Sequence, residues 1–363
     1  MAQSLNAFFG DLNSSAVSFA QGMPAHELFI ILGVAFAVIL PAVILGFGFL
    51  GFLKVSRVVQ RKAAERAMLN DQTPGNKILI GRIVGAAGSK AQRRVMDALE
   101  EKLPEFNFGS AFYMGAAPVN IEATDFALSR ADFQELDAAF QASGADLIVW
   151  GDTNFRSNTT RLCFATPATL RSNSSTGFFP LDIENAPAEW GQDEYLAVAY
   201  VAGKRLRPSL GRPADFRADR LQPILKSMGS LLESDIVLNG RARTELEDDY
   251  AAGALHVGEA LNSAEWLEKS ISFRTKSLEN MTPGSDPIRW SQAKIDLGRA
   301  MCLMCEQKFE PAKLQEAMAH IREGIDNTKS DARMQLAETG FASLQKAEQM
   351  LANRRRFSIR WSV

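Results

Sequence analysis

Cys302 and Cys305, in the run Cys302-Leu303-Met304-Cys305, have the CxxC spacing found in zinc sites and in redox-active thiol pairs. A structural zinc ion takes four ligands, and the sequence offers no second pair to complete such a site. A redox CxxC pair belongs at a helix N-terminus in a thioredoxin-like setting. Here the pair lies within a predicted helix, so we expect both cysteines to pack as small buried hydrophobic residues. The chain has three cysteines in all, the third being Cys163, which suits a reducing compartment.

A second set of residues with chemical potential follows the predicted strand 77–84. Gly85, Gly88 and Lys90 connect this strand to a helix, and helix N-termini bind anions such as phosphate. Their spacing matches neither GxGxxG nor GxxxxGK[ST]. We interpret the glycines as a device for tight packing of strand against helix, with an anion or nucleotide site as the alternative. Asp152 ends a buried strand, where open α/β sheets bind their ligands, but a single carboxylate there is also typical of a turn.

The remaining polar residues form no catalytic motif in the sequence. His26, His256 and His320 are scattered, and the GxSxG, HExxH and kinase patterns are missing. The acidic run at 245–249 is predicted to be a solvated helix face. We therefore predict a protein that is not an enzyme and that has no cofactor and no metal site. The net charge of -2 and the pI near 6.1 argue against nucleic-acid binding, which favours strongly basic domains.

The stretch 77–170 alternates between strand and helix patterns, which predicts βαβ units and a mostly parallel sheet with an antiparallel edge. The expected strands and helices are strands 77–84, 106–114, 146–150 and 161–165 and helices 90–103 and 131–142. This order, with the run GADLIVWGD at 144–152, resembles the small α/β domains of the TolB N-terminal and CsgG/FlgO-like type. That resemblance implies an interaction or binding module. A polar loop is expected at 171–191, followed by two bridging helices.

The C-terminal part repeats one helical pattern. Three copies align as Tyr250, Gly253, Val257, Gly258, Ala260 and Leu261; Trp290, Ala293, Leu297, Gly298, Ala300 and Met301; and Met334, Ala337, Phe341, Ala342 and Leu344. The second helices match as Leu267, Ser270, Ile271 and Leu278 against Leu314, Ala317, Met318 and Ile325. Large residues alternate with small ones because closely packed helices need a gap for each protruding side chain.

The runs DPIRWSQAKIDLGRAM and LQEAMAHIREGID resemble the tetratricopeptide family, with longer loops between repeats. The resemblance implies stacked helical hairpins whose curved surface binds a peptide or protein segment. An ordinary helical bundle is the alternative. The residues expected to face a partner are Lys294, Asp296, Arg299 and Glu338. Self-association into a homo-oligomer is a further possibility.

The run 28–53 contains no charged residue and is longer than the roughly 20 residues that cross a bilayer. No Lys or Arg precedes it, whereas five follow between 54 and 66. Because positive residues stay on the cytoplasmic side, we predict a single-pass anchor in the lipid bilayer of a bacterial inner membrane. Its N-terminus would lie outside and its C-terminus in the cytoplasm.

Together these features predict a membrane anchor, a small α/β domain and a tetratricopeptide-like α-helical repeat domain. The expected divisions are an extracytoplasmic tail at 1–27, a transmembrane helix at 28–53, a basic helix and linker at 54–76, an α/β domain at 77–190, bridging helices at 191–235, helical repeats at 236–354, and a basic and aromatic tail at 355–363. The leading functional hypothesis is a membrane-anchored adaptor that docks a protein partner through its repeats. The alternative is a signalling or sensory protein whose α/β domain binds a nucleotide or another small anion.

Overall fold

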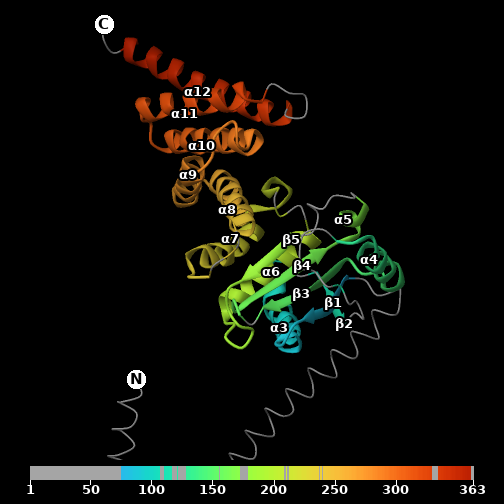
Figure 1. The fold of residues 1–363 in the computed structure, drawn as a ribbon. Helices are drawn as coiled ribbons and strands as arrows, with labels where there is room; N and C mark the ends of the chain where they lie inside the picture. Colours follow the sequence, from blue (N-terminus) through green and yellow to red (C-terminus); the bar gives the residue numbers. More distant parts are fainter. Residues whose placement is uncertain are drawn as a thin grey trace, which may run out of the picture. The chain divides into compact units, whose positions relative to one another are not determined.

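The computed structural model describes residues 75–106, 110–116, 121, 128–154, 156–171, 179–207, 210, 212–236, 238, 240–328 and 334–360. Over these residues the chain is mostly helical and includes one five-stranded mixed sheet (Figure 1). The strands are β1 (Asn76–Val84), β2 (Phe112–Ala116), β3 (Leu147–Asn154), β4 (Thr159–Ala165) and β5 (Phe179–Ile183). The helices are α3 (Gly88–Phe106), α4 (Arg130–Ser143), α5 (Pro167–Arg171), α6 (Gln192–Leu206), the 3-10 turn η3 (Pro213–Asp215), α7 (Ala218–Glu233), α8 (Gly240–Ala260), α9 (Ala264–Glu279), α10 (Pro287–Gln307), α11 (Pro311–Asp326) and α12 (Met334–Arg360).

The predicted membrane anchor has to be corrected. The apolar run 28–53 lies outside the described residues, as do the tail 1–27 and nearly all of the linker 54–76. Within the described ranges, no helix combines the length and the apolar composition that a bilayer crossing requires. The longest, α12, has 27 residues but includes Glu338, Lys346 and Glu348, and charges in the bilayer core are costly. The prediction of a single-pass membrane fold is therefore wrong for the structure described, which is a helical fold with a small mixed sheet.

The sheet has the strand order β2-β1-β3-β4-β5. β1 pairs in parallel with β2 and β3, whereas β3–β4 and β4–β5 are antiparallel. The predicted parallel pairing with an antiparallel edge agrees with the order of the first four strands, but the second strand, expected at 106–114, is β2 at Phe112–Ala116, and Phe106 belongs to α3 instead. β5 was not expected, because its five residues lie inside the predicted polar loop 171–191 and include Pro180. Proline is tolerated at a sheet edge, where one side of the strand needs no ladder hydrogen bonds.

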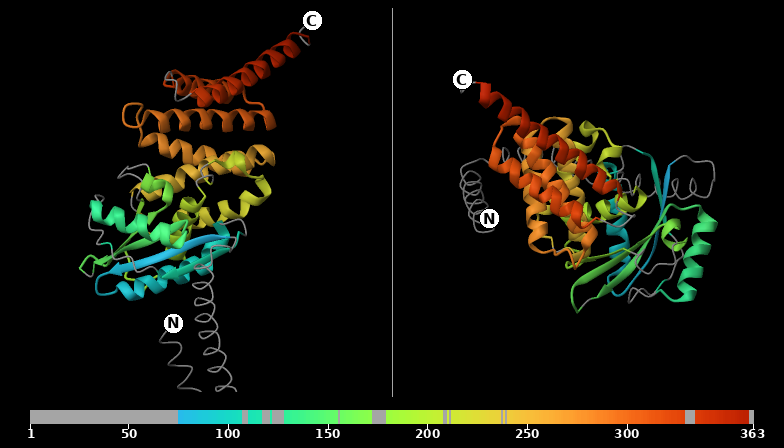
Figure 2. Two further views of the ribbon diagram at one scale, coloured as in Figure 1. Left: turned by 90° about the vertical axis from the view of Figure 1, so that its right-hand side faces the viewer. Right: turned by 90° about the horizontal axis from the view of Figure 1, so that it is seen from above.

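The two faces of the sheet bury alternate residues of the same strands, as a pleated sheet requires. On one face, Ile78, Ile80, Leu147 and Val149 pack with α3 and α6; on the other, Leu79, Ile148 and Trp150 pack with α4. Figure 2 shows α3 and α4 on opposite sides of the strands. The region is thus a three-layer sandwich whose central sheet is buried on both faces.

Helix α6 is part of this sandwich rather than a bridge. A Cβ built on Gly203 of α6 would lie 2.8 Å from the Cβ of Phe106 in α3, so the two helices are in close contact. The apolar core on this face continues through α7 into α8 and reaches Trp266 of α9. The α/β part and the first helical hairpin therefore share one continuous core.

The C-terminal helices form successive hairpins, α8 with α9 and α10 with α11, followed by α12 (Figures 1 and 2). Gly258 and Gly298 occupy the same position in consecutive copies of the predicted pattern. A Cβ on Gly258 would lie 2.8 Å from Leu267 Cγ, and one on Gly298 would lie 2.5 Å from the carbonyl oxygen of Ala317. Each glycine thus lets the first helix of a hairpin approach the second, as the alternation of large and small residues predicts.

Candidate functional site

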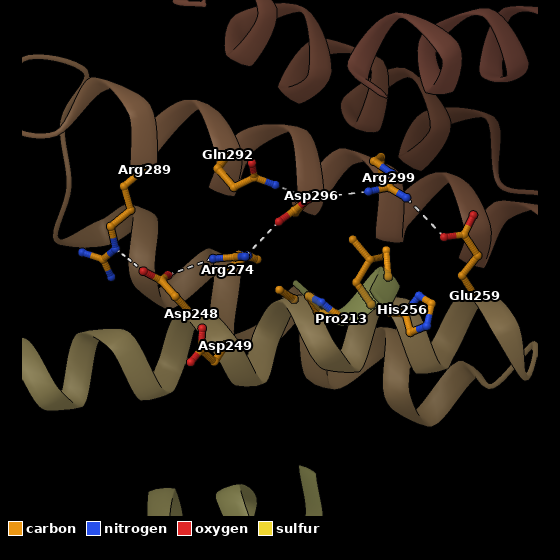
Figure 3. A pocket seen from close by; sticks show the side chains of 13 residues that line it. Pro213, Asp248, Asp249, His256, Glu259, Arg274, Arg289, Gln292, Asp296 and Arg299 are labelled. Atoms are coloured by element: carbon orange, nitrogen blue, oxygen red, sulfur yellow. Dashed lines mark hydrogen bonds and ion pairs between the residues drawn. The ribbon is translucent and has the colours of Figure 1, made fainter. Parts of the chain in front are cut away.

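The strongest candidate site is a charged cavity of about 340 Å³ between α8 and α10. Its walls come from two helices that occupy the same place in consecutive hairpins, and Arg274 of α9 reaches into it from behind (Figure 3). Pro213 and Ala214 of η3 border it at one side. The other lining residues are Asp248, Asp249, Ala252, Leu255, His256, Glu259, Arg289, Gln292, Asp296 and Arg299.

The charges along the cavity form one alternating chain of ion pairs. Arg289 pairs with Asp248, Asp248 with Arg274, and Arg274 with Asp296. The chain continues from Asp296 through Arg299 to Glu259, with N···O distances of 3.7 and 3.2 Å (Figure 3). Three arginines and three carboxylates are thus linked across three helices. The charges of this chain balance, and the fourth lining carboxylate, that of Asp249, is paired with Lys204 outside the cavity, so the cavity offers both hydrogen-bond donors and acceptors.

Arg274 is the centre of this chain and one of the most buried charges in the described part of the protein. Its side chain is 3% exposed, and its two terminal nitrogens each lie 2.8 Å from a carboxylate oxygen, of Asp248 and of Asp296. Asp296 is equally buried and also accepts a hydrogen bond from Gln292 at 2.9 Å. Burying ions is costly, and here the cost is offset because each ion is held by more than one partner.

The hairpin architecture does not require this buried charge. In the alignment of second helices, where Leu267 matches Leu314, Arg274 falls opposite Ile321. Ile321 is fully buried and packs with Leu314, Ala317 and other apolar residues of the second hairpin. The same position is therefore filled by an aliphatic side chain in one hairpin and by a doubly paired arginine in the other. A buried ion pair seldom stabilises a fold more than well-packed apolar residues do, which favours a role for Arg274 beyond packing.

Asp249, the neighbour of Asp248, connects the cavity to the α/β part. Its carboxylate accepts a hydrogen bond from the hydroxyl of Tyr200 at 2.7 Å and forms an ion pair with Lys204, both on α6. Burial raises the pKa of Tyr200 well above its ordinary value, and the nearby Asp249 carboxylate raises it further. Tyr200 therefore stays protonated and donates to Asp249. The wall formed by α8 is fixed to the sandwich by this contact.

The four residues predicted to face a partner do not form one surface. Asp296 and Arg299 line the cavity. Lys294 is directed to α11 instead, where its Nζ lies 2.7 Å from Glu323 Oε2 and 3.1 Å from His320 Nδ1. Burial lowers the pKa of His320, and the nearby positive charge of Lys294 lowers it further. Glu338 is an exposed residue of α12.

The sequence interpretation missed most of the cavity. The acidic run 245–249 is not a uniformly solvated face, because Asp248 pairs with the cavity arginines (Figure 3) and the buried Asp249 carboxylate is held by Tyr200 and Lys204. Arg274 and Arg289 were not singled out at all. An alignment of the two hairpins contains one signal of the cavity, because Arg274 of the first hairpin stands where the second hairpin has Ile321. The pairing partners come from three helices, and sequence spacing alone does not reveal them.

The candidate residues of the α/β part have a different environment. Gly85 has a φ of 104°, and a Cβ there would lie 2.3 Å from the carbonyl oxygen of Thr153. A Cβ on Gly88 would lie 1.9 Å from the carbonyl oxygen of Ile83. Close backbone packing therefore accounts for both glycines, as the main sequence interpretation predicts. Lys90 is exposed in the first turn of α3.

Asp152 lies at the end of β3, in register with Arg161 of β4. Arg161 in turn binds Asp182 of β5 through two hydrogen bonds, at 2.7 and 3.2 Å. Burial raises the pKa of Asp152, while the charge of Arg161 acts in the opposite direction. The arrangement is a row of alternating charges across three strands, which contributes to cross-strand pairing.

Cys302 and Cys305 both lie in α10 and pack in the apolar core of the second hairpin with Leu314 and Ile321. The expectation that they pack as small hydrophobic residues is confirmed. Burial raises the pKa of the Cys302 and Cys163 thiols to about 12 in each case. Burial also raises the pKa of the Cys305 thiol.

We predict that these thiols react slowly in the folded protein. The thiolate is the nucleophile, and at pH 8 a thiol with a pKa near 12 is almost entirely protonated. Iodoacetamide treatment followed by mass spectrometry should therefore find Cys163 and Cys302 largely unmodified in the native chain and fully modified in urea. Native labelling of Cys302 at the rate of a free cysteine would contradict the burial described here.

Among the residues that the structure describes, no group of His, Cys, Asp and Glu side chains has the arrangement of a metal site. Comparison of the chain with known protein families, with curated proteins and with solved structures finds no match. The resemblance of the C-terminal hairpins to tetratricopeptide repeats therefore stays a prediction from the sequence, as does that of the α/β part.

Proposed function

We propose that this chain is an adaptor whose tetratricopeptide-like hairpins dock a segment of a partner protein in the charged cavity between α8 and α10. The observation that carries the proposal is Arg274. A doubly paired, buried arginine occupies a position that the next hairpin fills with Ile321. Stability alone gives no reason for this difference, whereas recognition of a polar ligand does.

The chemistry of the lining suits a peptide. Arg289 and Arg299 have side chains that are 25% and 23% exposed, so part of each guanidinium faces the cavity. The Gln292 side chain adds an amide, which can both donate and accept hydrogen bonds. A peptide backbone presents N–H and C=O groups in equal number, and the balanced lining offers partners for both.

The position of the cavity also supports the proposal. It lies where two consecutive hairpins meet, and stacked hairpins generate the extended surfaces that repeat proteins use for binding. Arg274 fixes the two aspartates from behind, and the contact of Asp249 with Tyr200 and Lys204 fixes α8 against the sheet. A site whose polar groups are held before binding loses less entropy when a ligand arrives.

The test is a matched pair of tryptophan substitutions in the full chain. Ala252 lines the cavity, and Ala252→Trp places an indole in it without removing a charged group. Ala312 is an exposed residue of α11 away from the cavity, so Ala312→Trp adds the same ring without blocking it. Affinity capture from a native lysate with quantitative mass spectrometry should show proteins bound by wild type and by the Ala312→Trp variant and lost from the Ala252→Trp variant.

Thermal unfolding of both variants provides the control for folding. If the Ala252→Trp chain is folded and captures the same proteins in the same amounts as wild type, the cavity is not the docking site and the proposal fails.

A further inference from the structure

Helix α12 has the place of the first helix of a third hairpin, next to α11 (Figure 1). One side of it packs on the second hairpin, where Leu344 and Ala347 join the apolar core with Leu314. A Cβ on Gly340 would lie 2.8 Å from Ile325 Cγ1, so α11 and α12 are in close contact along this side. α12 therefore packs on the hairpin before it as α10 packs on α9.

The other side of α12 is exposed at positions that the earlier copies bury. Phe341 matches Val257 and Leu297 in the alignment of first helices. Val257 and Leu297 are 0% and 4% exposed, whereas Phe341 is 57% exposed. The next residue, Ala342, is also exposed, although the matching Gly298 is buried. The same two positions thus have opposite environments in consecutive copies.

The second helix of each hairpin accounts for this difference. A Cβ on Gly258 of α8 would meet Leu267 of α9, and one on Gly298 of α10 would meet Ala317 and Ile321 of α11. α12 is the last helix that the structure describes, and within the described residues none follows it to close a third hairpin. The uncovered side of α12 is therefore the side that takes a second helix in the preceding copies.

This side presents four exposed residues, Glu338, Phe341, Ala342 and Gln345, which we call the α12 open face. Their spacing of i, i+3, i+4 and i+7 places them along one side of the helix. An exposed aromatic ring with a small residue beside it suits a closely packed second helix, because each protruding side chain needs a gap opposite it.

Glu338 indicates the charge that such a helix must bring. In the alignment it matches Lys294 of α10, whose Nζ lies 2.7 Å from Glu323 Oε2 of the covering helix α11. Glu338 is exposed and has no hydrogen-bond or ion-pair partner among the described residues. The charge at this position is therefore reversed relative to the second hairpin. A helix in the corresponding place is complementary to α12 if it has a basic residue near the position of Glu323.

We propose that the α12 open face docks an amphipathic helix of a partner protein, in the place that α11 occupies against α10. The docked helix packs its apolar side on Phe341 and Ala342 and presents a Lys or Arg to Glu338. Amphipathic helices are recognised in this way, through apolar residues at helical spacing, and the charge pair adds selectivity. The proposal is independent of the docking cavity, because the cavity contains no residue of the α12 open face.

The experiment selects helical peptides on the full chain. A display library takes the 16-residue sequence of α11 as its frame and varies the positions of Ala317, His320, Ile321 and Glu323. A crosslink between positions 315 and 319 holds each peptide helical, since free helices of this length are marginal in water. Selection on the wild-type chain should enrich Lys or Arg at position 320 or 323. Selection on the Glu338→Lys chain should enrich Asp or Glu there instead.

The affinities of enriched peptides for variant chains are then measured by fluorescence anisotropy. Ala342→Glu places a charge in the middle of the open face and should weaken binding at least about tenfold, because an unpaired charge resists burial. Ile288→Asp is the matched control, since Ile288 is 55% exposed on α10 outside the open face, and this variant should bind like wild type. Thermal unfolding checks that both variants are folded.

The proposal is overturned if the selection enriches no peptide, or if enriched peptides bind the Ala342→Glu and Ile288→Asp chains equally. It is also overturned if Glu338→Lys leaves the charge preference of the enriched peptides unchanged. Sedimentation velocity of the wild-type chain tests a different occupant. Self-association that Ala342→Glu abolishes would assign the open face to a second copy of the chain and overturn the assignment to a partner helix.

Discussion

Replacing Arg274 by methionine is expected to lower the free energy of unfolding by about 3–5 kcal/mol, the usual cost of removing one partner from a buried ion pair. Methionine replaces the unbranched stem of the side chain but not the guanidinium, so it leaves the buried Asp296 carboxylate without its closest positive partner. Asp248 loses one of its two arginines at the same time. The urea concentration at the unfolding midpoint, followed by tryptophan fluorescence, measures the effect.

Arg217→Met is the matched control. Arg217 pairs with Asp219 across an exposed surface, with side-chain exposures of 79% and 58%, and exposed pairs contribute between zero and about 1 kcal/mol. Adding Asp296→Asn to Arg274→Met should recover part of the loss, because the unpaired buried charge is removed. Equal midpoints for Arg274→Met and Arg217→Met would show that Arg274 is not buried among carboxylates as described.

Gly298→Ala is expected to destabilise the protein by about 1–3 kcal/mol, although alanine is the better helix former. The new methyl group would lie 2.5 Å from both the carbonyl oxygen of Ala317 and Cγ1 of Ile321. One of these atoms belongs to the backbone, so α10 and α11 must separate to admit the methyl group. Overpacking of this kind costs about 1–3 kcal/mol, which exceeds the gain of about 1 kcal/mol from helix propensity.

The comparison for this variant is Gly240→Ala at the start of α8. A Cβ on Gly240 meets no atom within 4 Å, so the same substitution should be neutral or slightly stabilising there. Thermal unfolding of the two variants gives the answer. A Gly298→Ala protein as stable as Gly240→Ala would contradict the close contact of the two helices in the second hairpin.

Much of the fold was predictable because its elements carry local signals. The runs KILIGRIV and DLIVW bury residues on both faces of the sheet, and their continuous apolar character identifies them as strands. Ser129 and Gly144 cap α4 at its two ends, and the expected helix at 131–142 agrees with it. β5 escaped prediction because a short edge strand with a proline has no distinctive pattern. The role of α6 depends on its contact with Phe106, which is distant in the sequence.

The apolar run 28–53 led to an expectation that the described structure does not support. Composition predicted an anchor, but the run lies outside the described residues, and the helices within them are amphipathic or charged. The candidate site was harder to predict than the fold. Asp296 and Arg299 were named as partner-facing residues, yet the alternating chain that they join depends on Asp248, Arg274 and Arg289. Such pairings are tertiary, so only the arrangement of three helices reveals them.

The most direct test of the central claim is site-specific photocrosslinking from the cavity. A photoreactive amino acid replaces Gln292, which lines the cavity, and in a second protein it replaces Gln315, an exposed residue of α11 outside it. Irradiation in native lysate should attach a defined partner protein at position 292 and not at position 315, and the Ala252→Trp substitution should abolish the adduct. Adducts of equal yield at both positions, or none at position 292, would contradict the account of this cavity as a protein-docking site.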